Sequence, residues 1–213
     1  MPEMTRPREL FMHELRDIYY VEQQLVKMLP KLAGEATDAE LKRGFQQHLR
    51  QTERHVKNVE AAFKELDVRP SGERCPGFDG LREEHDEFMK EKPSKPVRDL
   101  FLTGAASRTE HYEIAAYTGL VATARALGEK KVATLLEKNL ADEKETLRKV
   151  DTIGRRLGRE GAKDERPATA ARRTASSSRT RGSSSARPAG SRASGRSGSA
   201  SASSPRRSST ARG

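Results

Sequence analysis

The sequence lacks the features that mark secreted, membrane-spanning or disulfide-stabilised proteins. It contains one cysteine, Cys75, so no internal disulfide can form, and a lone thiol suits a reducing cytoplasm. The sequence does not begin with a basic segment followed by an apolar run, so no secretory signal is predicted. The apolar runs of the chain are far shorter than the ~20 residues that span a membrane. We therefore expect a cytoplasmic protein without a membrane partner.

Motifs of several enzyme classes are also absent. The chain has no glycine-rich phosphate loop, no nucleophile elbow and no pair of cysteines at zinc-binding spacing. Cys75 follows Arg74, and because a basic neighbour can lower the pKa of a thiol, a redox role is one reading of this residue. A small packed side chain is the other.

The excess of positive over negative charge lies in the C-terminal quarter of the chain. The 213 residues carry 41 Lys/Arg and 31 Asp/Glu, a net charge of +10. Twelve of these cations and two of the anions lie in residues 161–213, so residues 1–160 carry 29 of each sign. From residue 166 onward the chain contains only Arg, Ser, Ala, Gly, Thr and Pro, which cannot build a core. We predict a folded domain over residues 1–160 and a disordered tail over residues 161–213.

Arginine dominates the cations of this tail, which suits a polyanionic partner. A guanidinium group binds phosphate in a bidentate manner, and the tail has no aromatic platform that could read bases. We expect non-specific nucleic-acid binding through counterion release, and with it a place at the nucleoid. A purely solubilising tail is the alternative, and the lack of an apolar anchor disfavours a membrane surface. The arginines concerned are Arg172, Arg173, Arg179, Arg181, Arg187, Arg192, Arg196, Arg206, Arg207 and Arg212.

Apolar residues recur at helical spacing through residues 7–157, and no alternating strand pattern competes with them. The pattern predicts helices over about residues 7–33, 38–66, 96–127 and 130–157, with a short extra helix around residues 81–89. Short loops join the first pair and the last pair, whereas a long segment links the second helix to the third. One long crossover in an all-α chain predicts a ferritin-like four-helix bundle.

Four glutamates occupy positions that a helical bundle normally gives to leucine. Glu22 interrupts the apolar stripe of the first predicted helix, Glu110 and Glu113 that of the third, and Glu143 that of the fourth. A carboxylate taken out of water is costly unless it is paired, hydrogen-bonded or bound to a metal. One such residue alone would pair with Lys or Arg, but four that converge indicate a carboxylate-bridged metal site.

The second predicted helix adds two imidazoles to the same core. Iron and manganese bind carboxylate oxygens and imidazole nitrogens, and Glu110 and Glu113 have the spacing to hold two adjacent ions. His48 is either a ligand or a hydrogen-bonding partner of a ligand carboxylate. We predict two metal ions, iron or alternatively manganese, with no catalytic residue beyond the ligands. The predicted ligands are Glu22, His48, His55, Glu110, Glu113 and Glu143.

Tyr117 either lies beside the centre or is a core tyrosine with a satisfied hydroxyl group. His13, His85 and His111 are expected at the surface or at the edges of the apolar stripes, and no function is assigned to them.

Six segments share a wider likeness: residues 11–25, 29–32, 48–52, 75–81, 110–117 and 140–144. They resemble the YciF-type ferritin-like proteins over about residues 7–157. The resemblance implies a bacterial four-helix protein that forms a homodimer, is linked to stress responses and has a dimetal centre; such proteins are often labelled ferroxidases. Ferritin-like sites usually use Glu-x-x-His on two helices. This chain has Thr52-x-x-His55 and Glu143-x-x-Thr146 instead, which predicts a nitrogen-poor site.

Two functions remain open. The first is a ferritin-like dimetal protein of the bacterial stress response, which oxidises or sequesters Fe(II) while its tail holds it on DNA. The second is a non-catalytic, nucleic-acid-associated bundle that binds no metal, because Lys, Arg and His satisfy its buried acids.

Overall fold

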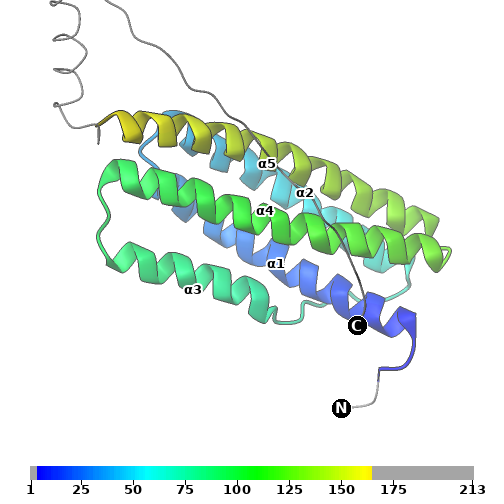
Figure 1. Cartoon of the computed structure of the whole chain (residues 1–213). Coiled ribbons are helices and arrows are strands. Elements are labelled where there is room, and N and C mark those ends of the chain that lie inside the picture. The colour runs from blue at the N-terminus through cyan, green and yellow to red at the C-terminus, as the bar shows by residue number, and fades with distance from the viewer. Residues whose placement is uncertain (1–3, 165–213) are drawn as a thin grey trace, which may run out of the picture. The chain divides into compact units, whose positions relative to one another are not determined.

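The computed structural model describes residues 4–164, which form an all-helical fold (Figure 1). No helix in this range is long and apolar enough to cross a membrane. The arginines predicted to bind nucleic acid lie outside the described residues. The helices are α1 (Pro7–Glu35), α2 (Ala39–Glu65), α3 (Pro76–Lys90), α4 (Lys95–Ala126) and α5 (Lys130–Asp164).

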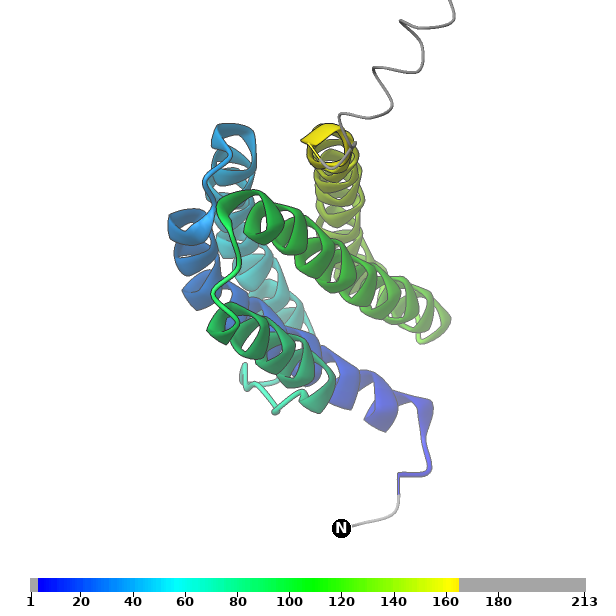
Figure 2. The same ribbon diagram turned by 60° about the vertical axis from the view of Figure 1, so that its left-hand side comes forward.

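Four of these helices form the bundle that the sequence predicts. Helices α1 and α2 form one antiparallel hairpin and α4 and α5 the other, with α2 packed on α5 and α1 on α4 (Figures 1 and 2). The link between the hairpins runs the length of the bundle, and α3 occupies most of it alongside α1 and α4. Because of this crossover α2 and α4 run parallel, which confirms the ferritin-like fold.

Two helices are longer than predicted, and local contacts explain both differences. Helix α3 begins at Pro76 because the Cys75 thiol caps it, accepting a hydrogen bond from the Phe78 amide at 3.4 Å. Helix α5 continues seven residues beyond the predicted end at residue 157, to Asp164. Arg156 supports this extension, because its guanidinium lies 3.2 Å from the Glu160 carboxylate one turn later.

Hydrogen bonds and one glycine fix the turns that join the helices. In the turn between α1 and α2, the Asp99 carboxylate of α4 accepts hydrogen bonds from the amides of Thr37 and Asp38, both at 2.8 Å. The Asp38 carboxylate in turn caps α2 by accepting the Leu41 amide at 2.9 Å. Gly128, with φ of +80°, allows the tight turn between α4 and α5. The register of the two hairpins is thereby set, and with it the depth of the polar residues in the core.

One histidine prediction was wrong. His85 on α3 is buried, with 1% of its surface exposed, rather than at the surface or a stripe edge. Its Nε2 lies 2.8 Å from the Glu35 carboxylate of α1 and its Nδ1 lies 3.1 Å from Asp86, so both ring nitrogens have partners. The contact with Glu35 helps hold α3 against α1. His111 is exposed and His13 is partly exposed, as expected.

Candidate metal centre

The six predicted ligands converge near the middle of the bundle. Each lies near the midpoint of its own helix, so the bundle places them at the same depth. All six are buried, and the most exposed of them, His48, has 4% of its surface accessible. Helix α1 supplies Glu22, α2 supplies His48 and His55, α4 supplies Glu110 and Glu113, and α5 supplies Glu143.

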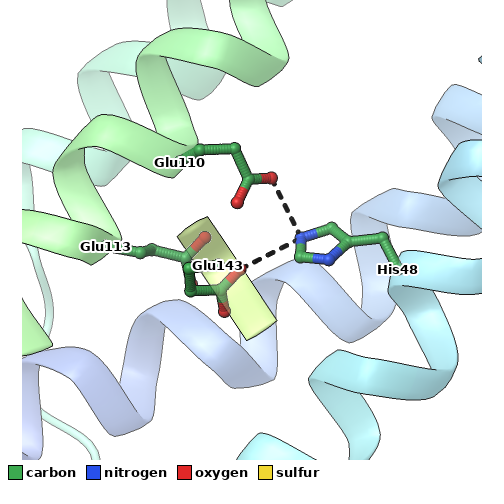
Figure 3. A group of neighbouring side chains, drawn as sticks. All are labelled: His48, Glu110, Glu113 and Glu143. Carbon is green, nitrogen blue, oxygen red and sulfur yellow. Dashed lines mark ion pairs between the residues drawn. The ribbon is translucent and has the colours of Figure 1, made fainter. Parts of the chain in front are cut away.

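Four of these side chains form a first group (Figure 3). One ligand atom each from His48, Glu110, Glu113 and Glu143 lies within 4.8 Å of all the others, a spacing that suits one metal ion. The Nε2 atom of His48 is 3.2 Å from Oε1 of Glu110 and 3.9 Å from Oε2 of Glu143. Both acids of α4 therefore point to the same place.

A second group adjoins the first and shares one residue with it. Glu22, His55 and Glu143 also offer ligand atoms within 4.8 Å of one another. The Nδ1 atom of His55 lies 2.7 Å from Oε1 of Glu143 and 3.4 Å from Oε1 of Glu22. Glu143 thus turns Oε2 toward the first group and Oε1 toward the second. The two groups are joined by Glu143, whereas Glu110 and Glu113 both belong to the first.

Most of the converging atoms have no hydrogen-bond partner among residues 4–164. Although His55 and Glu143 are close, their contact does not have hydrogen-bond geometry. In the same range no Lys or Arg forms an ion pair with the four glutamates. Buried carboxylates are normally satisfied, so this donor set fits metal ions. The atoms without partners are Glu22 Oε2, His48 Nε2, His55 Nδ1, Glu110 Oε2 and both oxygens of Glu113 and of Glu143.

Burial and mutual repulsion set the protonation of the acids. Burial, together with the charge of Glu143, raises the pKa values of Glu110 and Glu113 well above the ordinary range. Burial also raises the pKa of Glu22, although His55 opposes the shift. For Glu143 burial acts upward, but His55 and His48 outweigh it and lower the pKa. Without metal, these shifts make Glu143 the most acidic of the four carboxyl groups and favour the protonated forms of the two acids of α4.

The two histidines differ in charge. Burial acts to lower the pKa of His55, but Glu143 and Glu22 outweigh it and raise the pKa to about 10, so this ring is cationic without metal. Burial lowers the pKa of His48, which keeps that imidazole neutral with a lone pair available for a metal. Metal binding at His55 must therefore release a proton.

The departure from the Glu-x-x-His pattern has a geometric explanation. Thr146, which occupies the histidine position of that motif on α5, has its hydroxyl 3.5 Å from Nδ1 of His48. His48 therefore supplies from α2 a nitrogen that α5 lacks. Thr52, at the glutamate position on α2, donates its hydroxyl to the His48 carbonyl at 3.0 Å. Both nitrogens of the site come from α2, two turns apart, with one in each group.

Three residues surround the second group, and sequence reasoning missed two of them. Asp142 lies 3.3 Å from Nε2 of His55, opposite the nitrogen that faces Glu143. Tyr117 lies beside the centre, where its hydroxyl donates to Oε1 of Glu22 and accepts a hydrogen bond of 2.9 Å from Asn139. Asn139 interrupts the apolar stripe one turn before Glu143, a signal that could have identified it. Asp142 gives no such signal, because the stripe does not include it.

The structure favours the packed reading of Cys75. The thiol is buried, and its Sγ lies 2.8 Å from the Tyr112 hydroxyl. Burial raises the pKa of the thiol, so the thiolate is disfavoured. Arg74 does not counter this shift, because its guanidinium binds the Asp79 carboxylate at 2.6 Å.

The crossover topology and the buried carboxylate–histidine cluster define a ferritin-like bundle. Residues 6–163 match the family model described as "Domain of unknown function (DUF892)". Protein YciF of Escherichia coli (strain K12) is 35% identical over 144 residues, which cover 67% of this chain and 87% of that protein. The chain therefore belongs to the YciF (DUF892) family.

Solved structures support the same assignment. The crystal structure of the E. coli stress protein YciF superposes with a TM-score of 0.70 at 32% identity and covers 73% of this chain and 99% of that one. YcfI of Rhodopseudomonas palustris, described as a candidate structural protein, gives a TM-score of 0.69 at 40% identity, covering 71% and 96%. In each comparison the bundle accounts for nearly all of the relative.

Proposed function

We propose that this protein binds two Fe(II) ions in the bundle and oxidises them as substrate. The observation that carries the proposal is Glu143, whose two oxygens face two groups of buried ligand atoms without hydrogen-bond partners. A shared carboxylate between two N/O donor groups is the arrangement that a pair of iron or manganese ions requires. The E. coli relative is described as a stress protein, which suits removal of Fe(II).

The protonation states and contacts of the site residues suggest a role for each in this reaction. Binding displaces protons from Glu110, Glu113 and His55, because only the deprotonated groups can be ligands. The anionic carboxylates then favour the more highly charged Fe(III) product. Each Fe(II) gives one electron; hydrogen peroxide takes two electrons and two protons to give two waters, or dioxygen takes them to give peroxide. Tyr117 and Asn139 hold Glu22 in place during these changes.

The tail is proposed to hold the protein, and with it this activity, at the nucleoid. Its arginine-rich composition supports non-specific binding to nucleic acid, which would keep Fe(II) oxidation at the nucleoid and limit radical damage to DNA. The family resemblance supports a homodimer. Removing residues 167–213 leaves α5 whole and should abolish DNA retention at low salt while iron binding persists. DNA retention by the truncated protein would assign that role to the bundle instead.

Oxygen and peroxide consumption on addition of Fe(II) tests the oxidase proposal. We expect uptake that depends on Fe(II), persists in Glu145→Gln and is lost in Glu143→Gln, which keeps the side-chain size but removes the charge. Glu145 is exposed on the same helix and serves as the matched control. Iron binding without uptake would leave a storage or structural site. Failure to bind Fe(II) anaerobically would favour the metal-free bundle, a function consistent with the description of the R. palustris relative.

A further inference from the structure

A largely apolar cavity adjoins the first ligand group. Its volume is about 50 Å³, and residues from all five helices line it. Most of its wall is aliphatic or aromatic, as at Leu29, Phe78 and Leu102. His48 and Glu110 are also part of the wall, so the cavity reaches the metal centre. None of the steps assigned above uses this space.

The size and chemistry of the cavity restrict its occupant. A single water needs roughly 10–15 Å³, so the volume alone admits more than one, but each water also needs two to four polar partners. The aliphatic part of the wall offers none. Dry apolar cavities in proteins accept small uncharged molecules such as xenon. The apolar part of the wall therefore favours a small, uncharged, apolar occupant.

Small residues keep this space open. Gly44 on α2 and Ala105 and Ala106 on α4 line the cavity at helical positions that face the core. A Cβ atom added at Gly44 would have one neighbour within 4 Å, Cδ1 of Ile153 at 4.0 Å. Larger side chains here would fill the space, as protein cores normally do. Ala106 lies one turn before Glu110 on α4, and both residues line the cavity.

We propose that this cavity binds dioxygen and delivers it to the His48–Glu110 side of the centre. The inference rests on the proposed Fe(II) oxidation, and it identifies dioxygen as the oxidant that this cavity binds. Peroxide, which is polar and hydrogen-bonding, gains nothing from such a space. Dioxygen is small, neutral and apolar, and it partitions into apolar surroundings.

Xenon binding tests the cavity without iron. In ¹²⁹Xe NMR of the full-length metal-free protein, we expect a bound-xenon shift that is lost in Ala106→Leu and weakened in Gly44→Ala. Ala122→Leu, the same change at an exposed position of α4, should bind xenon like the wild type. Gly44→Ala keeps the test informative if Ala106→Leu fails to fold, since the added methyl meets no close neighbour. Absence of xenon binding in the wild type would overturn the proposal.

Oxidation kinetics test the role of dioxygen. Ala106→Leu should raise the KM for dioxygen several-fold, while Fe(II) stoichiometry and the rate with hydrogen peroxide stay unchanged. If a variant that has lost xenon binding keeps an unchanged KM for dioxygen, the cavity does not deliver dioxygen, and the proposed oxidase function is unaffected. Xenon binding by a wild type that consumes no dioxygen with Fe(II) would instead remove the oxidase function, and the proposed role of the cavity would fail with it.

Discussion

Replacing Glu113 by leucine should stabilise the metal-free protein. Glu113 is fully buried, neither of its oxygens has a hydrogen-bond partner within the described residues, and burial raises its pKa well above the ordinary range. Without metal the folded state therefore carries an unsatisfied acid in its core. Replacement of such a group by an apolar side chain of similar volume is worth about 1–3 kcal/mol in the free energy of unfolding. The same change removes one of the four ligands of the first group.

Chemical denaturation with and without metal measures both effects. In chelator, Glu113→Leu should shift the unfolding midpoint upward with an unchanged m value. With Fe(II) or Mn(II) under anaerobic conditions, the wild type should gain stability and the variant should gain less. Glu145→Leu, an exposed acid on α5, should change stability by no more than about 0.5 kcal/mol. A loss of roughly 3–5 kcal/mol in metal-free Glu113→Leu would mean that Glu113 is part of a buried ion pair, and the reasoning would be refuted.

Three further predictions follow from the electrostatics and the tail. Glu143→Ala removes the carboxylate nearest to cationic His55 and leaves only the more distant Glu22 and Asp142, so metal-free stability should fall by roughly 3 kcal/mol, and a stability equal to the wild type would contradict the pairing. The raised pKa values of Glu110, Glu113 and His55 mean that the folded metal-free protein binds more protons than the unfolded chain. The free energy of unfolding in chelator should therefore fall as the pH rises from about 6.5 toward 10, the interval over which His55 loses its proton later in the folded than in the unfolded protein. Metal binding at pH 7 should release protons, measured with a pH indicator in weak buffer; a slope of opposite sign or no proton release would contradict these assignments. If the tail contacts about six to ten phosphates, DNA affinity should fall ~10³–10⁵-fold between 50 and 200 mM salt, whereas an affinity independent of salt would contradict counterion release.

Periodicity predicted the bundle well because each helix has one buried face. The four core glutamates were visible in the sequence because each interrupts an apolar stripe that is otherwise continuous. The structure places them together with the two histidines of α2. Loop lengths also predicted the crossover, since short loops force antiparallel neighbours and a long one permits a parallel pair.

Other features depend on contacts between helices, which the apolar pattern of a single helix cannot reveal. The sharing of Glu143 between the two ligand groups follows from how α5 packs on α2. The spacing on α4 had instead suggested that Glu110 and Glu113 hold the two adjacent ions, whereas both lie in the first group. His85 was placed at the surface because Glu35 of α1, its partner at 2.8 Å, is 50 residues away in sequence. Asp142 lies beside the apolar stripe rather than on it. The cavity likewise arises from small residues on two helices, Gly44 and Ala106, that only the fold brings together.

The stoichiometry of metal binding tests the central claim most directly. Anaerobic Fe(II) titration of the full-length protein, with metal content measured after desalting, should give two ions per chain. Glu22→Ala should lose one of these ions, because Glu22 belongs to the second group alone, and Glu143→Ala should lose both or bind them far more weakly. Two ions in Glu143→Ala with wild-type affinity, or no ion in the wild type, would contradict a centre joined by Glu143.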